Sequence, residues 1–177
     1  MDIARTLRSY DGKRVAPFRA VAEAVHGMPG HAVPRLLDLA ASEEPELQAG
    51  ATWVIKYLAE RGVELRGPQA GALLQLLGRR IAPHATLHVL QTLPFVEVAR
   101  ADEPALKRAL LALIKSRRVF VRAWAYNGLG VLAVRNSELR GEVERLFDLA
   151  AETETAAVRV RIRHARAALV ARPANEG

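Results

Sequence analysis

Apolar residues recur along this chain with helical spacing. In residues 17–26 they fall three or four positions apart, which predicts an amphipathic helix that begins at Pro17. A shorter helix is predicted over residues 3–10, with Asp2 as its N-cap. These two helices precede a region in which the apolar pattern repeats as a whole.

The repeat is clearest in four leucine-rich segments. Their matching leucines are 37, 37 and 36 residues apart, a period typical of helical repeat proteins. The segments are RLLDLA (35–40), ALLQLL (72–77), ALLALI (109–114) and RLFDLA (145–150).

A second helix follows each of these segments. LQAGATWVIKYL (47–58) aligns with VRAWAYNGLGVL (121–132) at an offset of 74, twice the period, and Val158-Arg159 repeats Val121-Arg122 at 37. In the second unit the apolar stripe is shifted by one residue, and Pro94 is expected to end its helix early. Gly128 and Gly130 lie inside the helical pattern, where close approach of another helix explains them best.

The repeat predicts an all-α fold in which helix pairs stack and share one continuous core. We expect a single domain with an N-terminal helical cap in residues 1–30, repeats within 31–172 and a short tail, 173–177. The four units are predicted at about 31–62, 68–98, 103–134 and 138–171.

The best unit resembles the HEAT repeat family in Val121-Arg122, followed by Ala125 and Leu129-Gly130. The resemblance covers roughly residues 31–171 and implies an armadillo-type, right-handed α-solenoid whose second helices line a concave groove. It differs from the family at the turn before Val121, where Lys115–Arg118 stands and the family commonly has an Asp. HEAT proteins are mostly binding scaffolds, so the resemblance implies a surface and no particular chemistry.

Composition narrows the class of protein. The 177 residues contain no cysteine, which excludes disulfides and thiolate chemistry, and no apolar run is long enough to cross a membrane. The N-terminus lacks the apolar core of a secretion signal, so a cytoplasmic protein without membrane contact is expected. The net charge of +7 favours acidic partners, although it is also common in Arg-rich proteins that have none.

Most of the candidate binding residues are basic and lie in two equivalent turns. In stacked units these turns lie side by side, so the six cations could form one edge that binds an acidic protein or phosphates; a solvated, Arg-rich turn is the plainer interpretation. The six are Arg79, Arg80, Lys115, Arg117, Arg118 and Arg122.

A second candidate group lies on the last helix, where Arg159, Arg163 and Arg166 share one side. Arg159 is the counterpart of Arg122, so both, with Gln48, could project into one groove. The alternative is a polar cap on the terminal helix.

Two further patterns bear on chemistry. His84 and His88 have the i, i+4 spacing of zinc-binding helices, but no third ligand or general-base Glu accompanies them, so surface or groove histidines are the better interpretation. The segment Arg122-Ala123-Trp124 on a basic solenoid loosely resembles the HEAT-like alkylpurine DNA glycosylases. Those enzymes hold damaged DNA with Trp, Arg and a catalytic Asp. Here no Asp lies nearby in the repeat, and packing between units explains Trp124 more simply.

No catalytic constellation, metal-ligand cluster or phosphate-binding glycine loop is present in the sequence, so no catalytic residue, metal or cofactor is predicted. The leading hypothesis is a non-enzymatic scaffold that binds a protein partner through its groove or basic edge. The alternative is a nucleic-acid-binding module or HEAT-like DNA repair protein with a basic groove. The partner, the pathway and the oligomeric state stay open at this point.

Overall fold

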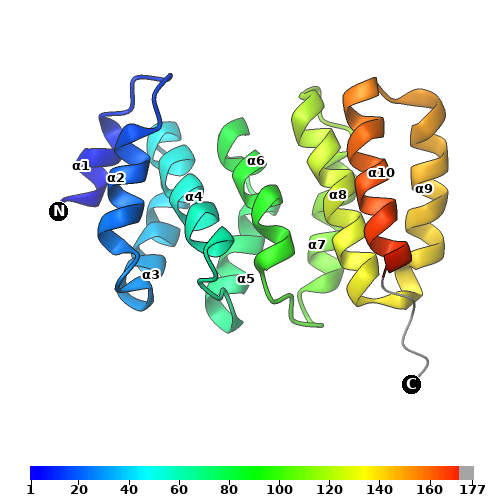
Figure 1. The fold of residues 1–177 in the computed structure, drawn as a ribbon, viewed down its shortest axis with the longest axis horizontal. Coiled ribbons are helices and arrows are strands. Elements are labelled where there is room, and N and C mark those ends of the chain that lie inside the picture. The colour runs from blue at the N-terminus through cyan, green and yellow to red at the C-terminus, as the bar shows by residue number, and fades with distance from the viewer. Residues whose placement is uncertain (172–177) are drawn as a thin grey trace. The chain divides into compact units, whose positions relative to one another are not determined.

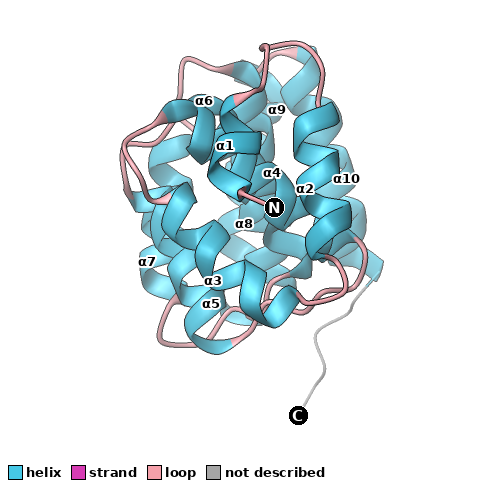
Figure 2. Cartoon of the chain, turned by 90° about the vertical axis from the view of Figure 1, so that its left-hand side faces the viewer, coloured by secondary structure: helices cyan, strands magenta, loops and turns pink. Residues whose placement is uncertain are grey.

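The computed structural model describes residues 1–171, and every secondary-structure element in that range is helical (Figures 1 and 2). The chain divides into two compact units, Met1–Asp102 and Glu103–Gly177. The α-helices of the first unit are α1 Ile3–Arg8, α2 Ala16–Val25, α3 Pro29–Ala40, α4 Pro45–Glu60, α5 Gly67–Gln75 and α6 Pro83–Thr92. Those of the second are α7 Glu103–Leu113, α8 Val119–Arg135, α9 Arg140–Thr153 and α10 Ala156–Ala171.

Local sequence signals set where these helices begin. Asp2 caps α1, because its carboxylate accepts a hydrogen bond from the Arg5 amide at 3.2 Å, as predicted. A proline lies in the first turn of each helix from α2 to α6, where its missing N–H costs nothing. As expected, Pro94 ends an α-helix early: α6 stops at Thr92 and a 3₁₀ turn, η2 (Leu93–Phe95), follows.

In the first unit, α4 is the helix around which the others pack. It contacts α1, α2, α3 and α6, and ten of its sixteen residues are buried. Gly50 permits the approach of α1 and α2: a Cβ built at this position would lie 2.8 Å from Phe18 Cε1 and 2.9 Å from Leu7 Cδ2. Replacing this glycine would force the N-terminal helices away from α4.

In the second unit, α8 has the corresponding central place. α10 packs along it, and α7 and α9 flank the pair (Figure 1). A Cβ at Gly130 would lie 2.9 Å from Ala165 Cβ and 3.5 Å from the Phe147 ring, so the predicted close approach at this glycine is confirmed.

The all-α fold class is confirmed, and each predicted unit contains two helices, α3–α4, α5–α6, α7–α8 and α9–α10. The boundary between the compact units falls where the third predicted repeat begins. Within residues 1–171, no helix is long and apolar enough to cross a membrane. The predicted tail, 173–177, lies outside the described residues.

Candidate functional site

Gln48 and Arg122 occupy equivalent places in the two units and make equivalent contacts. Each lies in the first turn of its helix, α4 or α8, and they are 74 positions apart in the repeat. The Gln48 amide donates to the Ser42 carbonyl at 2.7 Å, and the Arg122 guanidinium donates to the Ser116 carbonyl at 2.8 Å, in both cases six residues back. Each side chain therefore ties the start of its helix to the turn that precedes it.

Both side chains also reach forward to the next helix pair. Gln48 Oε1 accepts a hydrogen bond from the Ala82 amide at 2.6 Å, and Arg122 pairs with the Glu154 carboxylate at 3.0 Å. Gln48 is buried, and the side chains of Arg122 and Glu154 are only 18% and 13% exposed. The expectation that Gln48 and Arg122 project into an open groove is therefore wrong, because both side chains form contacts that join consecutive helix pairs.

Burial extends to the tyrosine one turn after Arg122. Tyr126 is 7% exposed, and its ring lies 6.4 Å from that of Phe147 in an edge-to-face arrangement. Burial and the nearby Glu154 carboxylate raise the pKa of the Tyr126 hydroxyl. Tyr126 is a packing residue between α8 and α9.

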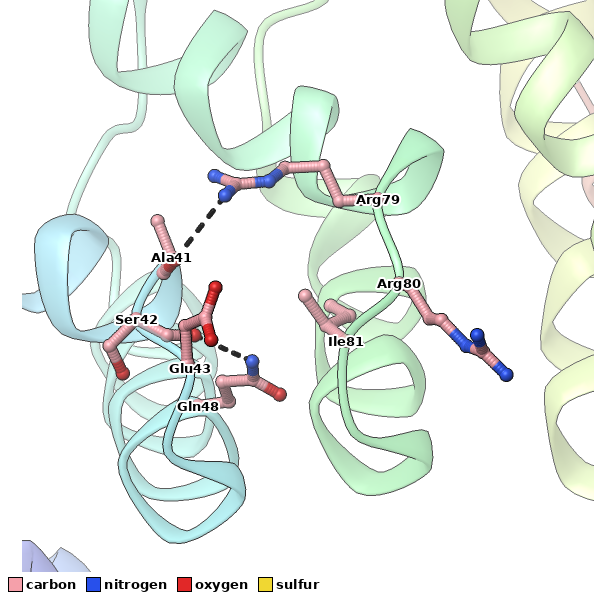
Figure 3. Close-up of a pocket in the computed structure, with 7 residues that line it drawn as sticks. All are labelled: Ala41, Ser42, Glu43, Gln48, Arg79, Arg80 and Ile81. Carbon is pink, nitrogen blue, oxygen red and sulfur yellow. Dashed lines mark hydrogen bonds between the residues drawn. The ribbon is translucent and has the colours of Figure 1, made fainter.

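The first unit has a polar cleft where the second has its ion pair. The cleft has a volume of about 340 Å³ and lies between the α3–α4 turn and the segment before α6 (Figure 3). Because Gln48 is shorter than Arg122 and meets a backbone amide, no charged pair fills this space. The lining residues are Ala41, Ser42, Glu43, Gln48, Arg79, Arg80 and Ile81.

Two predicted binding residues, Arg79 and Arg80, therefore lie at this cleft. Figure 3 shows the Arg79 side chain extending toward Ala41, whose carbonyl it meets at 3.4 Å, whereas Arg80 points away from it. Within residues 1–171 neither guanidinium has a carboxylate at ion-pair distance. The two cations are exposed and available, but they do not converge on one point.

The basic turn of the second unit is equally open. Lys115, Arg117 and Arg118 lie at its surface, and in the part of the chain that the structure describes they form no ion pair. The Arg118 amide donates a hydrogen bond to the Ser116 hydroxyl at 3.2 Å, which helps to order the turn. Since this turn and Arg79–Arg80 belong to different compact units, the six-residue cationic edge stays a prediction.

Aromatic residues flank the second basic turn. Phe120, in the first turn of α8, is 67% exposed. One turn later Trp124 is half-buried beneath the Arg161 guanidinium, which lies 3.9 Å from the ring centroid. The sequence pattern gave no sign of this contact, because the two residues are 37 positions apart and lie on different helices.

The other tryptophan is part of an aromatic row in the first unit. Successive ring centroids lie 4.4, 5.9 and 5.2 Å apart along Tyr10, Phe18, Trp53 and Tyr57. The Arg61 guanidinium covers the last ring at 3.6 Å. The rings join α2 and α4, so packing accounts for Trp53.

The three arginines of the last helix have different roles. Arg166 bridges Glu144 at 2.9 Å and Asp148 at 2.6 Å on α9, as a polar cap would. Arg159 and Arg163 are exposed and have no acidic partner among the residues described. Arg166 is therefore paired with α9, whereas Arg159 and Arg163 are available to a partner.

The histidine pair is split by its surroundings. His84 is exposed, whereas His88 Nδ1 lies 3.2 Å from both the Thr52 hydroxyl and the Ala49 carbonyl. Burial, together with the nearby Lys56 charge, lowers the pKa of His88 to about 4. His88 is thus a neutral side chain that joins α4 and α6.

Within residues 1–171 no group of three His, Cys, Asp or Glu side chains is arranged to hold a metal ion. The features of these surfaces that suit binding are exposed cations, a polar cleft and the exposed ring of Phe120. A comparison of the chain with protein-family models, curated proteins and solved structures finds no match.

Proposed function

We propose that this protein is a non-catalytic scaffold of stacked HEAT-like helix pairs that holds an acidic segment of a protein partner against its basic turns. The observation that carries the proposal is the polar cleft bordered by Arg79 and Arg80. Charged groups arranged in this way give a scaffold specificity and fast association with a partner of opposite charge.

The second unit supports this choice of ligand. There, a carboxylate, Glu154, fills the space between two consecutive turns by pairing with Arg122. In the first unit the position equivalent to Glu154 is Arg80, 74 residues earlier, and the space is open. A carboxylate from another protein would complete the charge pairing that this unit lacks, with Arg79 as its nearest donor.

The stacking of the helix pairs as a right-handed solenoid is part of the same proposal. Its support is the 36–37 residue period and the presence of two helices in each predicted unit. Small-angle scattering of the whole chain tests it: a solenoid gives one elongated, rigid particle, whereas two freely moving units would contradict it.

A crosslinking experiment tests the cleft directly. A photoreactive phenylalanine analogue in place of Arg80 should crosslink one protein in native cells. The same analogue in place of Arg19, an exposed residue of α2, is the matched control and should not. Equal products from the two positions would contradict the proposal.

A second candidate function, nucleic-acid binding, is favoured by one observation in the second unit. Phe120 is exposed beside Arg117 and Arg118, and bases stack on such aromatic rings while arginines contact phosphates. It is tested by titrating labelled single-stranded and duplex DNA with the protein at about 50 and 200 mM salt. Strong binding at low salt that is lost in Arg117→Glu with Arg118→Glu would favour this function over the first.

A further inference from the structure

The helix α8 is buried on two sides. In the repeat, α10 is the equivalent of α8, 37 residues later. One side of α8 packs with α7; the other is covered by α10 and α9 through small and apolar residues. Tyr126 and Gly130 lie on this second side, against Phe147 and Ala165, and the buried residues Ala123 and Ala133 share their face of the helix. The buried face of α8 is therefore the reference with which the equivalent face of α10 can be compared.

Among residues 1–171 nothing covers the same face of α10. Thirty-seven residues further on, the four positions are Val160, Arg163, Ala167 and Val170, and all four are exposed, Val160 at 42% and Val170 at 75%. Arg159, the counterpart of Arg122, has no carboxylate corresponding to Glu154 among the residues described. Exposed valines at positions that are buried one unit earlier indicate a face that another helix can cover.

The neighbouring helix α9 presents the opposite charge. Its outward side carries Glu144, Asp148 and Glu152, with one exposed cation, Arg145, beside them, and the Asp148 side chain is 72% exposed. Arg166 takes up part of this charge by bridging Glu144 and Asp148. Side by side at the surface there are thus an acidic helix and a basic helix.

The Arg166 contacts also fix the register of the two helices. α9 and α10 run in opposite directions (Figure 1). The ion pairs of Arg166 place it level with residues 144–148. With a rise of about 1.5 Å per residue in both helices, Arg163 is level with Asp148 and Arg159 with Glu152. The basic and acidic positions are matched pairwise along the helix axes.

We propose that this end face, defined by α9 and α10, binds the same face of a second copy of the chain. A twofold axis parallel to the helices lays α10 of each copy on α9 of the other and preserves the axial level of every residue. Arg163 then faces Asp148 of the second copy and Arg159 faces Glu152, while Val160 and Val170 are covered. Charge complementarity of this kind makes the second copy the preferred occupant.

The area of this face determines how tightly the two copies are expected to bind each other. Two helices about 24 Å long and about 20 Å wide together offer roughly 500 Å² per copy, or about 1,000 Å² in total. Such an area is at the lower limit for specific association. We therefore expect a weak dimer, with a dissociation constant in the micromolar range.

Sedimentation velocity of the full chain tests the proposal, over protein concentrations from about 1 to 500 µM, a range that brackets a micromolar dissociation constant. The expected result is a concentration-dependent shift from monomer to dimer that weakens at high salt. The double variant Arg159→Glu with Arg163→Glu should stay monomeric at concentrations where the wild type is half dimeric. The matched control, Arg5→Glu with Arg19→Glu in the first unit, should dimerise as the wild type does.

A charge-exchange mixture identifies the geometry. Asp148→Lys with Glu152→Lys should also be monomeric alone, but mixing it with Arg159→Glu, Arg163→Glu should give a heterodimer, because both contacts across the twofold axis become attractive again. Circular dichroism confirms that each variant is folded; if Asp148→Lys unfolds the chain, Glu152→Lys alone replaces it. A wild type that is monomeric at all concentrations, a dimer that tolerates both reversals, or a mixture that stays monomeric would each overturn the proposal.

Discussion

Arg122 and Glu154 form an ion pair that joins the start of α8 to the turn between α9 and α10. The guanidinium Nε lies 3.0 Å from the carboxylate, and both side chains are mostly buried. The same guanidinium donates to the Ser116 carbonyl, so one side chain holds two turns together. Arg122 is therefore a structural residue that connects consecutive helix pairs.

Removing one member of this pair should leave the other charge poorly solvated. We expect Arg122→Met and Glu154→Gln each to lower the free energy of unfolding by about 2 kcal/mol, somewhat less than for a fully buried pair. Urea denaturation measures this, and the double variant should lose less than the sum of the single losses. If the urea concentration at the midpoint of unfolding is the same for both single variants as for the wild type, the pair has no structural role.

The helical fold could be predicted from the sequence because it depends on patterns within about forty residues. The leucine spacing, the proline positions and the Asp2 cap are all local signals, and each corresponds to a helix or a helix end in the structure. The close approach at Gly130 was also predictable, because glycine weakens a helix and is favoured inside one where a neighbouring helix leaves no room for a Cβ.

The roles of the polar residues could not be predicted in the same way. Whether Arg122 is free or paired depends on Glu154, 32 residues away, and on the turn in which that acid lies. The position of the Arg161 side chain likewise depends on a residue of another helix, Trp124, over whose ring its guanidinium lies. A repeat identifies equivalent positions, but the partners at those positions come from side chains that the repeat leaves free to vary.

The buried histidine makes stability depend on pH. The pKa of His88 is about 4 in the folded chain, whereas a solvated histidine, as in the unfolded chain, has a pKa of 6.5. Below pH 6.5 the unfolded chain therefore binds a proton that the folded chain does not. Its contribution to stability is complete above pH 6.5 and is lost as the pH falls towards 4. The loss should reach about 3 kcal/mol.

Comparison of variants separates this effect from the titration of carboxylates over the same range. His88→Gln should reduce the difference in unfolding free energy between pH 7 and pH 4.5, whereas His84→Gln, at an exposed position of the same helix, should not. A folded-state NMR titration that places the pKa of His88 near 6.5 would show that its ring is solvated and does not join α4 to α6.

Two helical glycines should respond to alanine in opposite directions. At Gly130 the new Cβ would lie 2.9 Å from Ala165, so the gain in helix propensity of about 1 kcal/mol should be outweighed by overpacking, with a net loss of about 1 kcal/mol. At Gly71, in α5, the nearest atom is Asp102 Oδ2 at 3.7 Å, and alanine should stabilise by about 0.5 kcal/mol. Thermal denaturation measures both, and stabilisation by Gly130→Ala would show that α8 and α10 are further apart than described.

The sharpest test of the cleft as a docking site for an acidic protein is quantitative affinity capture from native cells with three forms of the chain. These are the wild type, Arg79→Glu with Arg80→Glu, and the matched control Arg5→Glu with Arg19→Glu. We predict that the wild type and the control capture the same acidic protein, and that reversal at the cleft reduces its recovery at least tenfold. Equal recovery by all three forms, or recovery of nucleic acid in place of a protein, would contradict the proposed function.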